Sequence, residues 1–437
     1  MNISPLRLAS RRTFGRQWLC PSCRRAQRKL TRSLATETGT SVDELLSPRT
    51  KKLISGPNNR KTIFSLIQPT GIPHLGNYLG ALQTWKELSD ETKVKDPARR
   101  GYYDLYFGLA DLHSLTSKQT PRERLEHIQQ TFASLLAIGL VDSQVFVQSH
   151  IAAPTELMWI LSNVASTGYL SRMTQWKDKA GLLKSEVDSE SQTLENLDDK
   201  SREALKLGLF SYPVLQAADI LVYDAHYVPV GEDQAQHVEF TRSLARSFNH
   251  MYGKDERTGL RVPELLLSPA RRIMSLQNPT KKMSKSDPDE MSRILITDSA
   301  QTIRSKIRGA KTDSVNGPIS FDPVTRPGVS NLIEIYRHAT RSVKTSSEIA
   351  QDFESASLGD LKAAVADAVI QALAGIPERY EHHIHQNLDR VMFLGCQRSR
   401  RRADDVLKRI RDAVGLYREP AYEFKDAQHN QEATQMR

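Results

Sequence analysis

A short lysine-rich segment is the first stretch of the chain whose side chains could do chemistry. Residues 281–286 read KKMSKS, and Pro279 and Pro288 flank them. Because proline interrupts helices and central strands, this segment is predicted to be a loop. Lysines on a mobile loop can follow negative charge as it develops on a leaving pyrophosphate. A solvated basic loop without a catalytic role is the alternative interpretation.

A second candidate segment follows a predicted strand at residues 62–67. Residues 69–77 (PTGIPHLGN) form a turn that opens a predicted helix over 76–90. Small residues at such a turn let the backbone and a helix N-terminus approach a phosphate chain. His74 and Asn77 add side-chain donors. The pattern indicates a nucleotide site, although an ordinary turn could have the same residues.

A third segment leads from a predicted strand at 227–230 into a predicted helix at 232–249. It reads VGEDQAQH over residues 230–237. Its free amides and Asp233 could fix a ribose or the amino group of a small substrate. The alternative is a simple N-capped helix start.

One helix face carries polar groups within an apolar segment. Tyr212, Gln216 and Asp219 stand at positions i, i+4 and i+7, which places them on one face. Leucine, isoleucine and alanine flank Asp219, and a carboxylate in such surroundings is unfavourable unless it is paired. Its partner is expected to be either a cation of the chain, Arg172 or Lys177, or a donor on the substrate.

The elements that must position these segments alternate between strand and helix. Further strands are predicted at 102–109 and 145–147. A helix with a capping box of Thr120 and Glu123 begins at Pro121. Its apolar stripe is predicted to consist of Leu125, Ile128, Phe132 and Leu135. This alternation predicts an α/β fold with a Rossmann-like parallel sheet.

The remaining segments are predicted to be mainly helical. A helical insertion spans about 151–222, and its part 184–203 contains seven acidic residues, as expected of a solvated surface segment. Beyond residue 299 only helices are predicted, which indicates a C-terminal α-helical bundle. Their predicted ranges are 299–309, 330–342, 358–390 and 402–417.

Charge and composition limit the possible classes of protein. The chain has 437 residues, three cysteines and a net charge of +10. Three cysteines cannot support a disulfide-built scaffold of this size, and no apolar run reaches membrane-spanning length. Residues 1–36 contain nine basic residues and no acidic residue. This composition predicts a mitochondrial presequence, with a disordered nucleic-acid-binding arm as the alternative.

Outside residues 1–36, basic and acidic residues nearly balance, at 52 and 51. Any polyanion must therefore bind local basic patches. The larger predicted patch comprises Arg398, Arg400, Arg401, Arg402, Lys408, Arg409 and Arg411, and the smaller one comprises Arg304, Lys306, Arg308 and Lys311. A solvated helix face is the alternative for each. Cys20 and Cys23 have half of a zinc-site spacing, but Cys396 is remote, so no protein-held metal is predicted.

Together, the three segments resemble the signatures of the class I aminoacyl-tRNA synthetases. Residues 74–77 (HLGN) resemble the HIGH signature, and residues 282–286 match the KMSKS signature. From residue 61 to about 417 the chain resembles the tryptophanyl-tRNA synthetases, with matching strings at 64–69, 172–177, 212–221 and 272–276. The chain departs from bacterial members in its longer acidic segment and in Gln216, where a methionine is expected.

The resemblance also implies a division into domains. A linker over 37–60 would join the presequence to a Rossmann-like catalytic domain over 61–290. A helical anticodon-binding domain over 291–418 and a flexible tail over 419–437 would follow.

Roles for individual residues follow from the resemblance alone. The residues implied in catalysis are His74, Asn77, Lys179, Lys282 and Lys285. Those implied in ATP binding are Gln68, Pro69, Thr70, Gly76, Asn77, Gly231, Glu232, Asp233, Ile273, Lys282, Met283, Ser284, Lys285 and Ser286. Those implied in tryptophan binding are Asp219, Tyr212, Gln234, Gln175, Gln216 and His113, with Asp219 accepting the indole N–H and so excluding phenylalanine.

The implied reaction is the ATP-dependent activation of L-tryptophan, with Mg²⁺ on the phosphates, and its transfer to a mitochondrial tRNA(Trp). A homodimer in the mitochondrial matrix, without membrane attachment, is expected. Three alternatives remain open on the sequence. They are a tyrosyl-tRNA synthetase, a small-molecule nucleotidylyltransferase, and a non-catalytic RNA-binding or splicing protein on the same scaffold.

Overall fold

The computed structural model describes residues 60–93, 103–140, 145–173, 206–231, 234–253, 258–267, 272–315 and 317–416. Two compact units are distinguished, Met1–Lys51 and Lys52–Arg437, and every described residue belongs to the second. The predicted presequence, the acidic segment 184–203 and the tail 419–437 lie outside the described residues, as does the linker before residue 60.

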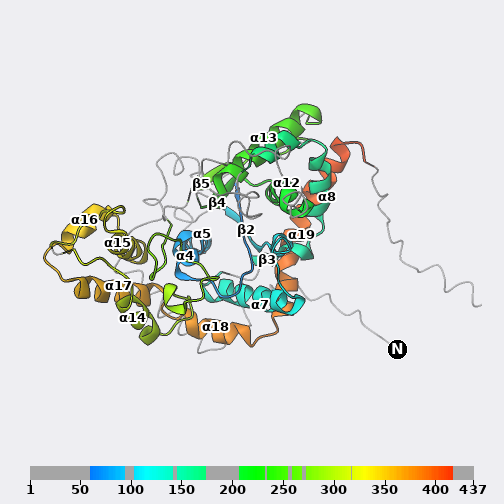
Figure 1. The fold of residues 1–437 in the computed structure, drawn as a ribbon. Coiled ribbons are helices and arrows are strands. Elements are labelled where there is room, and N and C mark those ends of the chain that lie inside the picture. Colours follow the sequence, from blue (N-terminus) through cyan, green and yellow to red (C-terminus); the bar gives the residue numbers. More distant parts are fainter. Residues whose placement is uncertain are drawn as a thin grey trace, which may run out of the picture. The chain divides into compact units, whose positions relative to one another are not determined.

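A five-stranded parallel sheet forms the centre of the described chain (Figure 1). Its strands are β1 (Lys61–Ile67), β2 (Tyr103–Leu109), β3 (Val145–Val147), β4 (Tyr227–Val230) and β5 (Glu264–Leu267). They lie in the order β3-β2-β1-β4-β5, and every pairing is parallel. The predicted parallel α/β fold is confirmed. Strand β5 alone was not predicted from the sequence.

Strand order reverses between β1 and β4, and this reversal locates the functional edge of the sheet. Successive connections leave β1 toward opposite sides, so the loops after β1 and β4 meet beyond the carboxyl ends of these strands. Two of the chemically interesting segments, 69–77 and 230–237, are those two loops.

Alternate residues of each strand face two different apolar cores. Ile63 and Phe107 belong to one cluster of buried residues, whereas their neighbours Phe64 and Tyr106 belong to the other. Both faces of the sheet are therefore covered, as expected for parallel strands of nearly continuous apolar sequence. The strands themselves leave no solvated face for a ligand, so the site must be built from the loops at their ends.

The helices of the sheet domain mostly follow the predicted ranges. After β1 they are α4 (Leu75–Asn77), a π-helical turn η1 (Tyr78–Leu82) and α5 (Gln83–Thr92). The others are α6 (Asp111–Ser114), α7 (Pro121–Ala137), the 3₁₀ turn η3 (Gln148–His150), α8 (Ala153–Ser162), α9 (Thr167–Arg172), α12 (Leu207–Leu221) and α13 (Ala235–Met251).

Helix α7 tests the most detailed local prediction. The capping box of Thr120 and Glu123 is present, with proline in the first turn. Phe132 and Leu135 are fully buried, but Leu125 is 55% exposed, so its place in the apolar stripe was wrong. The first two turns of α7 extend beyond the core that the later turns contact.

The C-terminal helices are longer and more divided than the periodicity indicated. They are η7 (Glu290–Ser292), α14 (Ala300–Arg308), α15 (Pro327–Thr340), α16 (Ser346–Asp352), α17 (Leu358–Ala372), α18 (Ile376–Ile384) and α19 (Leu388–Ala413). The single helix predicted over 358–390 is broken at Gly375, whose φ of +73° is left-handed. The helix predicted over 402–417 begins fourteen residues earlier, at Leu388.

Much of helix α19 packs against the sheet rather than against the other C-terminal helices. Cys396, Ala403, Val406, Leu407 and Ile410 belong to the same buried cluster as Phe64 and Phe146 of the sheet. In Figure 1 α19 runs past β3 toward α8, and it contacts both. The predicted C-terminal helical region is therefore present, but its last helix, α19, covers one face of the sheet. Among the described residues, no helix is long and apolar enough to cross a membrane.

Candidate active site

The turn after β1 is organised by a reciprocal cap. His74 is the N-cap of α4, where the His74 N–H donates to Asn77 Oδ1 (3.2 Å) and the Asn77 N–H donates to His74 Nδ1 (3.2 Å). A Cβ on Gly76 would lie 3.0 Å from His74 Cε1, so a larger residue at this position would crowd the imidazole ring. Two residues predicted to act on a nucleotide thus form one rigid unit.

The proton and charge of His74 follow from its surroundings. Because Nδ1 accepts a hydrogen bond, the neutral ring carries its proton on Nε2. Burial, together with the charges of Lys285, Lys282 and Arg293, lowers the pKa of His74 from 6.5 to about 3. His74 is therefore a neutral hydrogen-bond donor near pH 7, in a region of positive potential that favours an anion.

Lys285 connects the KMSKS loop with the turn after β1, although more than 200 residues separate the two segments. Its Nζ donates to the carbonyl oxygens of Thr70 (3.1 Å) and Gly71 (2.9 Å) and to Thr70 Oγ1 (3.1 Å). All of these acceptors are uncharged. Burial and the nearby Arg293 lower the pKa of Lys285 from 10.5 to about 7. The ammonium group therefore lies close to the turn without a counter-charge among these partners.

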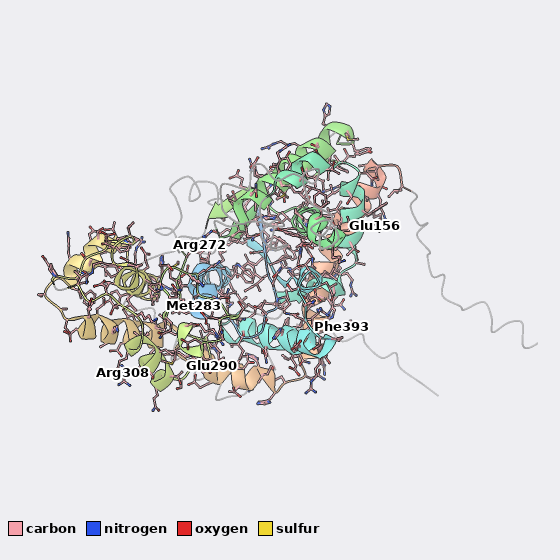
Figure 2. The ribbon with its side chains drawn as sticks, viewed as in Figure 1. Glu156, Arg272, Met283, Glu290, Arg308 and Phe393 are labelled. Atoms are coloured by element: carbon pink, nitrogen blue, oxygen red, sulfur yellow. The ribbon has the colours of Figure 1, made fainter. Side chains whose placement is uncertain are left out.

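A short antiparallel bridge supports the base of the KMSKS loop. Met274 and Lys282 face each other in this bridge, where the Met283 N–H donates to the Ile273 carbonyl (3.0 Å) and the Ser275 N–H donates to the Lys281 carbonyl (2.8 Å). The side chains of Met283 and Ile273 are both buried, so these two predicted ATP-site residues anchor the loop in the core. Figure 2 shows Met283 beside the helices that follow β1.

The rest of the loop is partly exposed and locally ordered. Ser284 and Ser286 share a hydrogen bond between their hydroxyl groups (2.9 Å), and Lys282 is exposed. Arg293 donates to the Asp287 carbonyl (2.8 Å) and thereby ties the end of the loop to the next segment. This next segment then lies beside the HIGH turn, since the Leu75 N–H donates to the Ile294 carbonyl (2.7 Å).

The buried carboxylate of Asp219 has partners other than those the sequence suggested. His113 Nε2 lies 2.9 Å from Asp219 Oδ2, and Gln148 Nε2 donates to both carboxylate oxygens at 2.8 Å. The expectation that Arg172 or Lys177 pairs with Asp219 was therefore wrong for Arg172, whose guanidinium lies near the Tyr169 ring instead. Lys177 lies outside the described residues.

Gln148 was missed because its role depends entirely on tertiary contacts. It follows β3 and is almost fully buried, and its Oε1 accepts the Leu112 N–H (3.1 Å). This bond fixes the orientation of the amide and turns its NH₂ group toward Asp219. Burial raises the pKa of Asp219, while the hydrogen bonds of His113 and Gln148 oppose that shift.

The other residues on the Asp219 face of α12 also have side-chain partners. The Tyr212 hydroxyl lies 2.9 Å from His237 Nε2, and Gln216 Nε2 donates to Gln234 Oε1 (3.2 Å). The structure thus brings Gln216 and Gln234 together across α12 and the start of α13. Their binding of tryptophan, like that of Tyr212 and His113, stays a prediction.

Several predicted site residues lie outside the described chain. They are Gln175, Lys179, Glu232 and Asp233. Gln68, Pro69 and Gly231 are described and lie at the ends of β1 and β4, where the strand order reverses. No group of three or more histidine, cysteine, aspartate or glutamate side chains in the described ranges could hold a metal.

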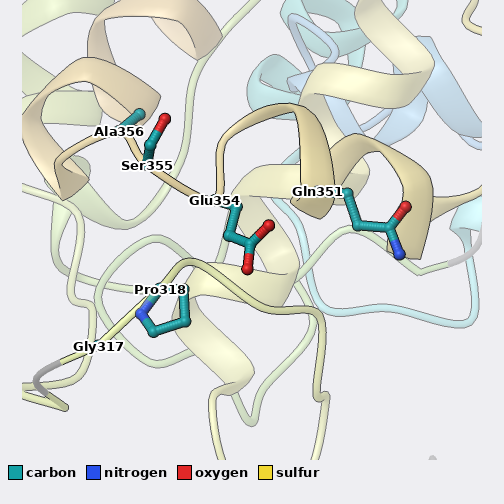
Figure 3. A pocket seen from close by; sticks show the side chains of 6 residues that line it. All are labelled: Gly317, Pro318, Gln351, Glu354, Ser355 and Ala356. Carbon is teal, nitrogen blue, oxygen red and sulfur yellow. The ribbon is translucent and has the colours of Figure 1, made fainter.

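A surface pocket elsewhere contains none of these residues. It has a volume of about 600 Å³ and is lined by Gly317, Pro318, Gln351, Glu354, Ser355 and Ala356 (Figure 3). It lies at α16 and the loop before α15, so nothing connects it with the chemistry at the ends of β1 and β4.

Most arginines of the larger basic patch contact the catalytic domain rather than only solvent. Arg398 pairs with Asp104 (2.8 Å), and Arg402 and Arg409 both pair with the buried Asp224 (3.1 and 2.6 Å). Arg411 pairs with Glu156 of α8, which Figure 2 labels, and Arg400 donates to the His150 carbonyl. Arg401 and Lys408 are exposed, and no ion pair involves either among the described residues.

The smaller basic patch is also divided. Lys306 is 7% exposed and pairs with Asp298 (2.6 Å), whose carboxylate accepts the Leu295 N–H (3.0 Å). Lys306 therefore stabilises the segment beside His74, and its charge is not available to bind a phosphate of a nucleic acid. Arg304 pairs with Asp367, while Arg308 and Lys311 are exposed.

Comparison with known proteins agrees with this geometry. The family model of the class I tRNA synthetases (W and Y) matches residues 57–374. A mitochondrial tryptophan–tRNA ligase of Saccharomyces cerevisiae is 40% identical over 365 residues, covering 82% of this chain and 92% of that protein. One from Schizosaccharomyces pombe is 41% identical over 365 residues, with coverages of 82% and 96%.

Solved structures give the same result. The tryptophanyl-tRNA synthetase of Mycoplasma pneumoniae superposes with a TM-score of 0.67 at 29% identity, covering 82% of this chain and 99% of that one. That of Campylobacter jejuni, complexed with ADP and tryptophan, has a TM-score of 0.59 at 26% identity, with coverages of 81% and 100%. The chain therefore belongs to the tryptophan–tRNA ligase family.

Proposed function

We propose that this enzyme activates L-tryptophan with ATP and transfers it to tRNA(Trp), using the residues at the carboxyl ends of β1 and β4. The observation that carries the proposal is the contact of Lys285 with the Thr70–Gly71 turn, which unites the HIGH-like and KMSKS segments. The relatives of about 40% identity are tryptophan–tRNA ligases, so the tyrosyl and non-catalytic alternatives are not favoured.

Adenylate formation requires little from the protein beyond position and charge. A tryptophan carboxylate oxygen attacks the α-phosphorus in line, the bond from that phosphorus to the bridging oxygen breaks, and pyrophosphate leaves. Lys282 and Lys285 would stabilise the charge that moves onto the pyrophosphate, and the Nε2–H of His74 would donate to a phosphate oxygen. Mg²⁺ would arrive with ATP as part of the substrate, bound by phosphate oxygens.

Selection of tryptophan is assigned to Asp219. The donors of His113 and Gln148 use one lone pair of Oδ1 and two of Oδ2, so Oδ1 retains acceptor capacity for an indole N–H. A buried carboxylate with that capacity discriminates strongly against a phenyl ring, which cannot donate. Gln148 and His113 support this selection by holding the carboxylate in one orientation.

The cellular setting is inferred from the relatives and the N-terminal composition. The two fungal relatives are mitochondrial, and residues 1–36 have the composition of a presequence, so we assign the enzyme to mitochondria and specifically to the matrix. A homodimer is proposed from the family resemblance. The helical segment 291–418 is proposed to bind the anticodon end of the tRNA.

An ATP–pyrophosphate exchange assay tests the proposed activity. Wild-type protein is expected to exchange with tryptophan and not with tyrosine. Asp219→Ala is expected to lower kcat/KM for tryptophan by about a hundredfold or more, because the buried indole N–H loses its acceptor, with little change in KM for ATP.

A matched control separates selection from general damage. Asp313→Ala removes a different carboxylate, one that pairs with Arg326 on the C-terminal side of the chain. It is expected to leave KM for tryptophan unchanged. Exchange with tyrosine alone would identify a tyrosyl enzyme, and exchange with neither amino acid would refute the proposed reaction.

A further inference from the structure

The strand that carries the KMSKS bridge has two edges, and only one of them faces the loop. Backbone groups of an extended segment point alternately to opposite sides. Ile273 and Ser275 direct their carbonyl and N–H groups toward Met283 and Lys281. The N–H and carbonyl of Met274 must therefore point away from the loop, and they need a different partner.

That partner is a single side chain from the C-terminal helices. Asn331 of α15 accepts the Met274 N–H with Oδ1 (2.9 Å) and donates to the Met274 carbonyl with Nδ2 (3.0 Å). Asn331 is 5% exposed. Its amide thus takes the place of a third strand beside the segment 273–275. Neither aspartate nor alanine could provide both an acceptor for the Met274 N–H and a donor for the Met274 carbonyl.

The start of α15 packs against the backbone of Lys311, which is hydrogen-bonded to the residue after the segment 273–275. A Cβ on Gly328 would lie 2.3 Å from the Lys311 carbonyl, so α15 approaches this backbone as closely as glycine allows. The Lys311 N–H in turn donates to the Leu276 carbonyl (2.8 Å). Asn331 is therefore presented to Met274 from a fixed base.

These contacts form one continuous path from α15 to the candidate active site. Asn331 holds Met274, Met274 faces Lys282 in the bridge, and Lys285 three residues later contacts the Thr70–Gly71 turn. We propose that Asn331 is a positioning residue for adenylate formation, which sets the position of the KMSKS lysines by fixing the strand beneath them. This inference rests on the proposed function and adds a residue to it.

The test compares Asn331→Asp with wild type in the tryptophan-dependent exchange assay. Aspartate keeps the acceptor for the Met274 N–H but faces the Met274 carbonyl with a negative charge. We expect kcat to fall about tenfold or more. A decrease of this size corresponds to the loss of one to two buried hydrogen bonds that stabilise the transition state. KM for tryptophan is expected to stay within about twofold, since the Asp219 face is not involved.

A second readout follows the strand directly. Amide hydrogen exchange in a peptide spanning 272–286 is expected to become faster in Asn331→Asp, while α12 exchanges as before. Ser330→Ala is the matched control, because Ser330 is equally buried on α15 and its hydroxyl accepts the Asp322 N–H (2.9 Å) without touching Met274. It is expected to change neither kcat nor the exchange of 272–286.

Two results would overturn the assignment. One is an Asn331→Asp enzyme with the kcat of wild type. The other is an increase in KM for tryptophan as large as the decrease in kcat, together with faster exchange throughout the protein. Wild-type protein that shows no tryptophan-dependent exchange would instead refute the proposed function, so the two failures are distinguishable.

Discussion

At the scale of single residues, Lys285, Lys282 and Arg293 place positive charge around His74, and none of the three forms an ion pair within the described part of the chain. Lys285 is held by carbonyl and hydroxyl oxygens, and His74 is kept neutral by burial and by the lysines around it. Electrostatic attraction contributes more to the binding of a polyphosphate at such a site than it would if the lysines were already paired with carboxylates. The ligand then supplies the negative charge that these lysines lack. Binding of ATP should therefore be linked to the protonation of Lys285.

The sign of this linkage gives a pH prediction. The pKa of Lys285 is about 7 in this structure, and phosphates beside the ammonium group would raise it. Above pH 7 the free enzyme must therefore take up a proton to bind ATP, and KM for ATP is expected to rise with pH by up to about tenfold per unit. Below pH 7 the lysine is already charged, and KM should level off.

The exchange assay between pH 6 and 9 measures this dependence. Lys285→Arg is the comparison, because a guanidinium stays charged over the whole range. Its KM for ATP is expected to be less dependent on pH, whatever its absolute activity. A wild-type KM that does not change with pH would contradict the assigned pKa of Lys285.

At the scale of elements, the β1 turn depends on helix α7. Thr131 of α7 donates to the Gly71 carbonyl (2.9 Å), which is also an acceptor for Lys285. Gly71 has a φ of +88°, and a Cβ there would lie 2.9 Å from Gln130 Oε1 and 3.2 Å from His127 Cδ2. Glycine is thus required by both the backbone conformation and the closeness of α7.

Gly71→Ala is expected to lower stability and activity together. The left-handed backbone is unfavourable for alanine by about 1–2 kcal/mol, and the crowding against α7 adds to it. Displacement of the turn should also separate its carbonyls from Lys285 and reduce the exchange rate. Thermal unfolding and the exchange assay measure the two effects.

Gly359→Ala provides the contrast within the same chain. Gly359 lies in the first turn of α17, has an ordinary φ, and would place its Cβ in normal contact, 3.4 Å from Ser357 Oγ. Its melting temperature is expected to be equal to or slightly above that of wild type. An equal decrease of stability in both variants would show that the Gly71 conformation is not the cause.

At the scale of the whole molecule, α19 connects the end of the chain to the sheet. Its arginines pair with Asp104, Asp224 and Glu156, which come from β2, the turn after α12, and α8. Asp224 is buried and has a left-handed φ of +49°, so its two arginine partners stabilise both a charge and a turn. The larger basic patch therefore serves partly to hold α19 against the rest of the protein through ion pairs.

This division separates two kinds of basic residue that the sequence could not distinguish. Arg402→Ala is expected to lower stability by about 1–2 kcal/mol, because the buried Asp224 loses a partner. The double variant Arg401→Ala/Lys408→Ala is expected to melt as wild type. It should raise KM for tRNA several-fold and make tRNA binding less dependent on salt, since each cation that binds a phosphate releases about one counterion.

Aminoacylation, tryptophan-dependent exchange and thermal melting distinguish these outcomes. Adenylate formation should be unchanged in the double variant, since both side chains are exposed and neither is among the residues assigned to the candidate active site. Aminoacylation kinetics identical to wild type would remove the exposed face of α19 from the tRNA-binding surface.

The elements that were predicted correctly are those with local causes. Periodicity and caps predicted four of the five strands and the start of α7, and proline and glycine marked the KMSKS loop and the β1 turn. The sequence also predicted which residue types would contact a phosphate chain, because that prediction depends on side-chain chemistry and on the turn that carries the residues.

Tertiary structure decided which groups face each other. Gln148 on Asp219, Asn331 on Met274 and Asp224 between two arginines join segments that lie far apart along the chain. No local sequence pattern predicts such pairs. A buried amide or arginine can have the same sequence neighbours whether it binds a strand, a carboxylate or a ligand. Their roles are set only when packing has removed water and left each polar group with few partners in reach.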